Sequence, residues 1–212
     1  MPVLEKKCEV GTPVVQDRRI TRSKKALRGA LISLIEEKGF ESLTVGDLCA
    51  RADLNRGTFY NHYQDKDELL ASFENEVMAG LDSWQKKMER VSIADMAAYR
   101  LKKTSPLFLV ELFDYLRSEG DFLHAVLGPR GDVRFASRMR DSICNHLINS
   151  ILHEKYRRDP SPFVGYYLAY NTYAYLGVMA RWIETGMQES SEEMALVVMR
   201  LFFIKPGESI KL

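Results

Sequence analysis

Hydrophobic residues recur at spacings of three and four along most of the chain, and Pro and Gly fall between these periodic segments. Such spacing places apolar side chains on one face of a helix, so the pattern predicts an all-α fold with few strand signals. One of the predicted helices, the fourth in chain order, begins at a cap at Asp65 and ends at about Met88. The other predicted helices span residues 18–38, 44–51, 55–62, 94–103, 106–118, 122–127, 132–156, 162–185 and 191–204.

Capping residues set the starts of three consecutive helices near the N-terminus. Thr44 and Asp47 have the spacing of a capping box, and Asn55 is a good N-cap for the next helix. Asp65 and Glu68 repeat the box at the fourth helix. Two short capped helices, joined by a tight turn after a longer helix, predict a helix-turn-helix, the motif that places its second helix in the DNA major groove.

The stretch "LNRGTFYNHY" then divides into two faces. Arg56 and Thr58 lie in the first turn, where a side chain reaches a base edge or a phosphate. Gly57 has no side chain, so the backbone there can approach a phosphate closely, and the helix N-terminus favours that anion. Tyr60 and His62 carry polar tips suited to phosphate oxygens. Phe59 and Tyr63 are better explained as core of the small bundle.

The net charge of the whole chain is only +1, so any electrostatic attraction to DNA must come from a local basic patch. A basic cluster precedes the motif, and no acidic residue interrupts residues 18–28. Its members are Arg18, Arg19, Arg22, Lys24, Lys25 and Arg28. This cluster predicts contacts to the DNA backbone, although a solvated helix face explains a basic run alone equally well. Lys66 adds a further cation beside the start of the fourth helix.

Residues 21–70 resemble the DNA-binding domain of the TetR family of transcriptional regulators, through the stretch "GFESLTVGDLCARADLNRGTFYNHYQDKDELL". The resemblance implies DNA-backbone contacts by Thr44, Gly57, Thr58, Tyr60, His62 and Lys66. It implies an influence on base choice for Arg56, Thr58 and Asn61. One departure is Asp53, which stands in the turn where the family usually has Gly; Asp tolerates a left-handed backbone, so the turn is expected to survive.

The resemblance also implies a larger C-terminal helical domain that dimerises and holds an effector pocket. We expect a tail at 1–16, the helix-turn-helix domain at 17–64 and the second domain at 65–212. The predicted dimer interface comprises Tyr166, Gly177, Ala180, Val197 and Leu201, with a monomeric core as the alternative. The predicted effector pocket comprises Phe108, Phe113, Tyr115, Phe122, Tyr170, Tyr173 and Met179, with plain core packing as the alternative.

Other classes of protein find little support. The chain has no apolar run long enough to cross a membrane and no signal-peptide core, and its three cysteines form no CxxC pair. Cys144 and His146 are two residues apart and His153 is seven further on, which suits no metal on one helix. No nucleophile elbow or phosphate loop is present. We therefore expect no enzyme activity, no cofactor, no metal, and a cytoplasmic location.

The resemblance implies a homodimeric repressor that binds a palindromic operator in double-stranded DNA and is released by a small-molecule effector. The alternative is a relative without an effector, which acts through a protein partner as a co-activator or architectural DNA-binding protein. A filled core with an exposed apolar patch would favour that alternative.

Overall fold

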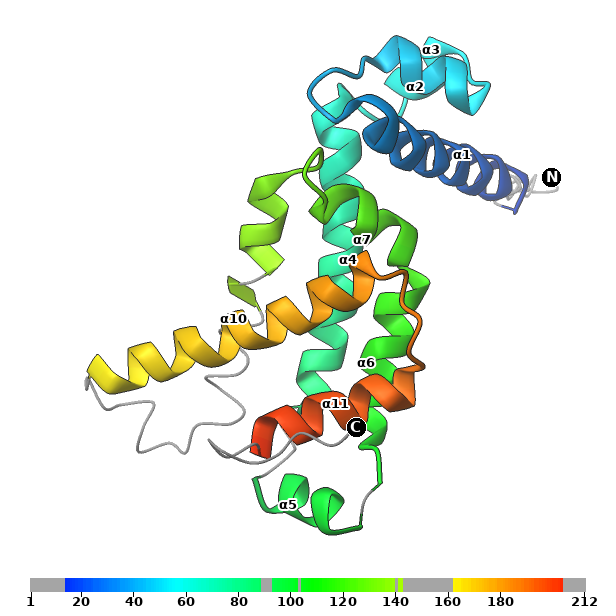
Figure 1. Ribbon diagram of the computed structural model, residues 1–212. Helices are drawn as coiled ribbons and strands as arrows, with labels where there is room; N and C mark the ends of the chain where they lie inside the picture. The colour runs from blue at the N-terminus through cyan, green and yellow to red at the C-terminus, as the bar shows by residue number, and fades with distance from the viewer. Residues whose placement is uncertain (1–13, 89–92, 103, 140, 143–161, 204–212) are drawn as a thin grey trace, which may run out of the picture.

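The computed structural model describes residues 14–88, 93–102, 104–139, 141–142 and 162–203. Within these ranges the chain forms helices and no strand. The helices are α1 (Val14–Lys38), α2 (Val45–Ala52), α3 (Arg56–Tyr60), α4 (Lys66–Met88), α5 (Ile93–Lys102), α6 (Leu107–Ser118), α7 (Gly120–Leu127), α10 (Pro162–Glu184) and α11 (Ser191–Phe203). We call α1–α3 the head and α5–α7, α10 and α11 the body; α4 runs from one to the other (Figure 1).

The all-α prediction is confirmed, and most predicted helices are within two residues of the observed bounds. The first helix begins four residues earlier than predicted, at Val14, and the third ends at Tyr60. Of the helix predicted for 132–156, residues 133–139 and 141–142 are helical, and 143–161 lie outside the described residues.

The head is built around a small core in which α1 packs against α2, and α2 against α3. The apolar stripe of α1 points inward, and the turn that follows it adds two more apolar side chains. The fully buried members include Leu27, Leu31, Leu34, Ile35, Phe40, Leu43, Leu48 and Phe59. Gly39 ends α1 with a φ of 83°, which a glycine adopts without strain.

Helix α4 belongs to both cores. Its first turns bury Leu69, Leu70 and Phe73. Its later turns bury Val77 and Leu81, where α4 packs against α6. Because one continuous helix crosses both cores, a change in its tilt moves the head relative to the body.

Helix α1 is also fastened directly to the body by Arg28. Its guanidinium pairs with Glu119, at the junction of α6 and α7, and lies 5.5 Å from the ring centre of Phe73 and 4.9 Å from that of Phe122. Lys24 of the same helix pairs with Glu76 of α4. A cation held between two aromatic faces and a carboxylate is attracted by all three, so this contact orients α1.

Candidate nucleic-acid interface

The start of α2 is fixed by the predicted capping box. The Asp47 amide donates to Thr44 Oγ1 at 3.2 Å, and the Thr44 amide donates to Asp47 Oδ2 at 2.8 Å. Lys38, at the end of α1, adds an ion pair to Asp47 at 2.8 Å. The Lys38 contact, followed by the Thr44 bonds, holds the pKa of the Asp47 carboxyl well below its ordinary value. The carboxylate thus joins the end of α1 to the start of α2.

The turn between α2 and α3 depends on Asp53. This residue ends α2 in the left-handed region, with φ 54° and ψ 47°. Its amide and that of Leu54 bond back to the Ala50 and Cys49 carbonyls, which satisfies the last carbonyls of α2. The expectation that Asp replaces the family's glycine in a left-handed turn is therefore confirmed.

Helix α3 has one buried face and one exposed face, as predicted. The Asn55 side chain accepts a hydrogen bond from the Gly57 amide at 2.8 Å and caps the helix. Phe59 is 0% exposed and fixes the helix in the head core, whereas Tyr60 beside it is 56% exposed. Thr58 and Tyr63 are half-buried. The predicted DNA contacts Arg56, Gly57, Asn61 and His62 are all exposed.

A feature that the sequence analysis missed is the contact between Arg56 and α2. A side chain at Gly46 would meet Arg56 Nη2 at 2.7 Å, so the glycine leaves room for the guanidinium. Arg56 also lies close enough to Cys49 to oppose the rise in the pKa of that thiol, which burial causes. The predicted base-reading side chain therefore lies close to the first turn of α2 while it stays exposed to solvent.

Two other predicted DNA contacts have roles inside the protein. The Lys66 ammonium donates to the Phe40 and Glu41 carbonyls, at 3.0 and 2.9 Å, and lies 4.8 Å from the centre of the Phe40 ring. It thereby ties the start of α4 to the turn after α1. Thr44 is exposed, but its hydroxyl also donates to Asp47 Oδ2 at 2.7 Å. Direct contact of either residue with DNA stays a prediction.

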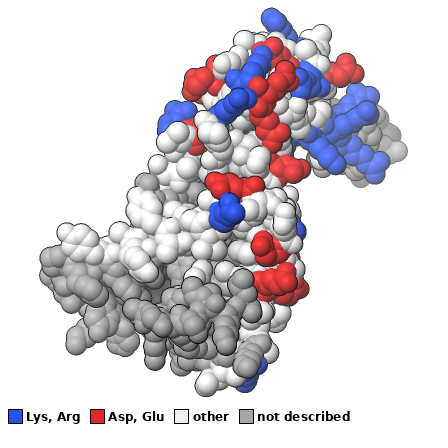
Figure 2. Space-filling view, in the orientation of Figure 1, with Lys and Arg blue, Asp and Glu red and all other residues white. Residues whose placement is uncertain are grey.

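The basic cluster of α1 divides into two sets. Arg18, Arg19, Arg22 and Lys25 are exposed and face solvent. Lys24 and Arg28 instead pair with acids of α4 and the α6–α7 junction, so the structure gives these two cations an intramolecular role. Figure 2 shows most of the cations of this view over the head, interspersed with acidic side chains, while the described part of the body shows acidic groups and few cations. The head combines an exposed helix face with nearby cations, an arrangement suited to a polyanion.

The predicted effector-pocket residues do not form one group. Phe113, Phe122 and Met179 are buried, and Phe108 is half-buried. Tyr115 donates its hydroxyl to the Val77 carbonyl at 3.0 Å, and burial raises its pKa to about 12.

Tyr170 and Tyr173 differ from these residues, because they are 72% and 62% exposed. Helical spacing places them away from the buried face of α10, which carries Thr172, Met179 and Trp182. The sequence analysis placed these two tyrosines in the effector pocket, whereas the structure places them on the surface of the protomer.

The exposed side of α10 instead carries an apolar stripe at spacings of three and four. Its members are Tyr166, Tyr170, Tyr173, Gly177 and Ala180, and all are exposed. Tyr166 is 75% exposed. On α11, Leu196 and Leu201 are exposed and Val197 is half-buried. Four of the five predicted dimer residues are thus exposed, and the dimer interface itself stays a prediction.

Other functional groups are sparse in the part of the chain that the structure describes. No cluster of three or more His, Cys, Asp or Glu there could hold a metal ion. Cys144, His146 and His153, which the sequence analysis considered as ligands, lie outside it. None of its helices combines the length and hydropathy that crossing a bilayer takes.

Both the N-terminal and the C-terminal part of the chain match models of known protein families. Residues 27–73 match the bacterial regulatory proteins of the tetR family, and residues 103–203 match a transcriptional regulator C-terminal region. A curated relative, the uncharacterized HTH-type transcriptional regulator YxbF of Bacillus subtilis (strain 168), is 38% identical over 55 residues. That match covers 26% of this chain and 14% of the relative's length.

Solved structures share the fold over most of the chain. The fatty acid degradation regulator FadR from Bacillus halodurans superposes with a TM-score of 0.60 at 17% identity, covering 88% of this chain and 97% of that one. The dihydroxyacetone kinase operon activator DhaS superposes with a TM-score of 0.51 at 19% identity, covering 84% and 93%. Identities this low carry the likeness of fold alone.

Proposed function

Because the chain belongs to the TetR family of transcriptional regulators and is not an enzyme, we propose that it is a homodimeric repressor that reads a palindromic operator and is released by a small molecule. The observation that carries the DNA-binding part is the division of α3, whose Phe59 is buried while its first turn stays exposed. Burial of Phe59 fixes the orientation of the helix, so the exposed face is presented in one defined direction.

The roles of individual residues follow from their positions on that face. We propose that Arg56, Thr58 and Asn61 influence base choice. Gly57, Tyr60 and His62 contact phosphates beside the groove. Arg22 contacts the flanking backbone from α1, where it is exposed with three other cations, and Thr44 and Lys66 contribute at the ends of α2 and α4.

Dimerisation is proposed through the apolar stripe of α10 together with the exposed residues of α11. A two-fold axis would bring the stripe against its own copy and bury the tyrosines of both protomers. Two heads related by this axis would read half-sites about one helical turn apart, which is why the operator is expected to be palindromic. The regulator would act in the cytoplasm, where the bacterial chromosome is accessible to it.

The proposed domain division, at residues 64 and 65, places α4 at the start of the second domain. An effector would then act by favouring one of two tilts of α4, since that helix crosses both cores. Ligand and operator would compete through the separation of the two heads rather than for one surface.

Selection of DNA by the purified full-length protein tests this function. Fragmented genomic DNA from the source organism is incubated with the protein, and the retained fragments are sequenced. The expected result is one enriched palindrome with half-sites about ten base pairs apart. A matched selection with the Arg56→Ala variant should retain the same fragments with weaker enrichment, because a base contact is lost while backbone contacts remain.

Retention without any enriched sequence would contradict sequence-specific reading. It would favour the alternative function, in which the chain positions on DNA through its backbone and acts through a protein partner. Absence of retention altogether, with the head folded, would contradict DNA binding itself.

A further inference from the structure

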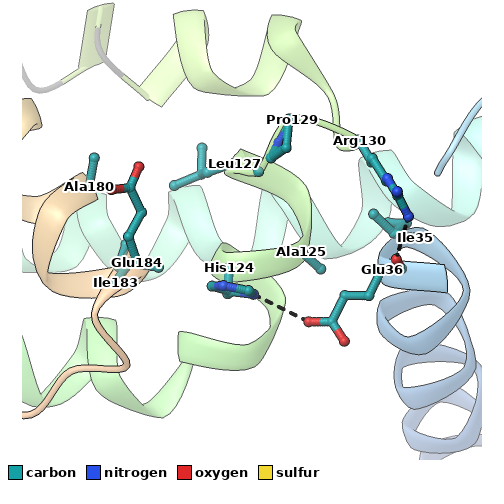
Figure 3. A pocket seen from close by; sticks show the side chains of 11 residues that line it. Ile35, Glu36, His124, Ala125, Leu127, Pro129, Arg130, Ala180, Ile183 and Glu184 are labelled. Atoms are coloured by element: carbon teal, nitrogen blue, oxygen red, sulfur yellow. Dashed lines mark hydrogen bonds and ion pairs between the residues drawn. The ribbon is translucent and has the colours of Figure 1, made fainter. Parts of the chain in front are cut away.

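A cleft of about 750 Å³ lies where the head meets the body, which is within the size range of small-molecule pockets. It is lined by Ile35, Glu36, His124, Ala125, Leu127, Gly128, Pro129, Arg130, Ala180, Ile183 and Glu184. Figure 3 shows these side chains converging from α1, α7 with its following loop, and α10. None of the residues predicted for the effector pocket lines it, and we call it the junction cleft.

Three helices end at the junction cleft. Glu36 lies in the last turn of α1, which ends at Lys38, and Leu127 is the last residue of α7. Glu184 is the last residue of α10. The carboxyl end of a helix carries a partial negative charge, equivalent to roughly half an elementary charge, and favours a cation. Arg130 engages the last carbonyls of α1, and the amides of Thr185, Gly186 and Met187 bond to those of α10. The side chains that line the cleft therefore set its charge, rather than the helix ends.

Two carboxylates line the cleft. Glu36 and Glu184 come from opposite walls, α1 and α10 (Figure 3). Among the described residues, no hydrogen bond or ion pair engages Glu184. Glu36 contacts His124 Nδ1 at 3.3 Å, and both of these side chains are about half exposed, so the contact is open to exchange.

The guanidinium of Arg130, in the wall of the cleft, already donates hydrogen bonds to the backbone. Arg130 Nη1 donates to the Glu36 and Glu37 carbonyls, at 3.0 and 3.1 Å, and so neutralises the end of α1 rather than the carboxylates. Between the charged groups the surface is apolar. Its members are Ile35, Ala125, Leu127, Pro129, Ala180 and Ile183. Ala180 also belongs to the apolar stripe of α10, so the cleft borders the proposed dimer interface.

We propose that the junction cleft is a binding site for an amphipathic organic cation, whose apolar part covers this surface while its charge lies between Glu36 and Glu184. A neutral ligand would gain only the apolar contact, and an anion would be repelled by both carboxylates. The site lies on the outside of the body, between it and α1, and is distinct from any cavity inside the helical body.

Occupancy of this cleft is coupled to the position of the head. One wall is α1, and the loop after α7 is bonded to the turn after α1 by the Phe40 amide, which donates to the Arg130 carbonyl at 3.0 Å. A cation that displaces His124 from Glu36 changes the contacts between α1 and α7. This consequence rests on the proposed DNA-binding function, and by linkage the ligand and the operator change each other's affinity by the same factor.

Titration calorimetry with a size-matched pair of ions tests the site on the full chain, in the absence of DNA. The probes are tetraphenylphosphonium and tetraphenylborate, which share shape and apolar surface but have opposite charges. The phosphonium should bind at least about tenfold more tightly than the borate. The Glu184→Gln and Glu36→Gln variants should each weaken phosphonium binding by about tenfold, whereas Glu192→Gln, which removes an exposed charge of α11 outside the cleft, should not.

Failure of the phosphonium to bind, equal binding of the two ions, or unchanged binding by both cleft variants would overturn the proposal. A second titration in the presence of the selected operator measures the coupling. A change in phosphonium affinity that Glu184→Gln abolishes supports control of the head, and an unchanged affinity would overturn that control while leaving the site itself in place. If no DNA is bound at all, the calorimetry without DNA still decides the site, so the two proposals fail separately.

Discussion

The head and the exposed face of α10 both contain aromatic side chains, but those side chains differ in how far the protomer buries them. In the head, Phe59 is buried where α3 packs against α2, and caps at Thr44 and Asn55 fix each helix locally. On α10, Tyr166, Tyr170 and Tyr173 are exposed in the protomer, and the proposed dimer would bury them.

This difference shows when a sequence pattern alone predicts the environment of a side chain. A motif whose partners are local predicts both the helix and the direction of each side chain. A long helix that is apolar on most sides predicts burial but not the identity of what buries it. The predictions below challenge this contrast, from the largest expected effect to the smallest.

Removal of the Phe59 ring should have the largest effect, because the side chain is fully buried in the head. Phe59→Ala is expected to cost about 3–5 kcal/mol of unfolding free energy. Tyr60→Ala, on the exposed side of the same helix, should cost less than about 1 kcal/mol. Urea denaturation followed by circular dichroism measures both, and equal losses would contradict the assignment of the two faces of α3.

A charge at Gly177 should break the proposed dimer without disturbing the protomer. No atom of the described residues lies within 4 Å of where a Cβ would be, so Gly177→Glu introduces no clash within the chain. We expect the dimer dissociation constant to rise by at least about a hundredfold, measured by analytical ultracentrifugation. Ala79→Glu, an exposed position on α4, is the control and should leave the dimer intact. An unchanged Gly177→Glu dimer would rule out the stripe as the interface.

Loss of the α2 cap should have an intermediate effect confined to the head. Thr44→Ala removes the oxygen that accepts from the Asp47 amide, and we expect a loss of about 1 kcal/mol. Thr44→Ser keeps that oxygen and should restore most of the stability in the same denaturation assay. Equal losses for both variants would show that the methyl group, rather than the cap, stabilises the turn.

The stability of the protein should respond to pH through Glu74, which is buried on α4. Burial raises the pKa of its carboxyl to about 7, against an ordinary 4.5, although Arg138 lies 3.0 Å from one oxygen and opposes the shift. The folded state therefore binds the proton more tightly than the unfolded state, and the stability contribution falls as pH rises from about 4.5 to about 7.

Melting temperatures between pH 5 and pH 8 measure this dependence. Glu74→Gln carries no titrating proton and should flatten the decline over that range. Asp82→Asn, at an exposed position of α4, should show the same decline of melting temperature with pH as the wild-type protein. An identical slope in the Glu74→Gln variant would contradict the assignment to this carboxyl.

The parts of the fold that the sequence predicted share one property, which is that their signals are local. The capping box of Thr44, the cap of Asn55 and the left-handed Asp53 each depend on residues fewer than five positions away. The contact of Arg56 with Gly46 and the bonds of Lys66 to the turn after α1 depend on tertiary approach, and spacing gave no sign of either.

The body was predicted less completely for the same reason. Apolar spacing located α10 and α11 to within a few residues, but it could not separate the tyrosines that face the protomer surface from side chains that face the core. The junction cleft was not predicted at all. It forms from the ends of helices that are about ninety and sixty residues apart in the chain, so only the packed structure brings Glu36, His124 and Glu184 together.

Footprinting of the selected operator with hydroxyl radicals tests the central claim most directly, since it requires both the exposed face of α3 and the pairing of two protomers. The account predicts two protected half-sites on one face of the duplex, about ten base pairs apart, and their joint loss in the Gly177→Glu variant at concentrations where it is monomeric. A single continuous protected segment that Gly177→Glu leaves unchanged would contradict it.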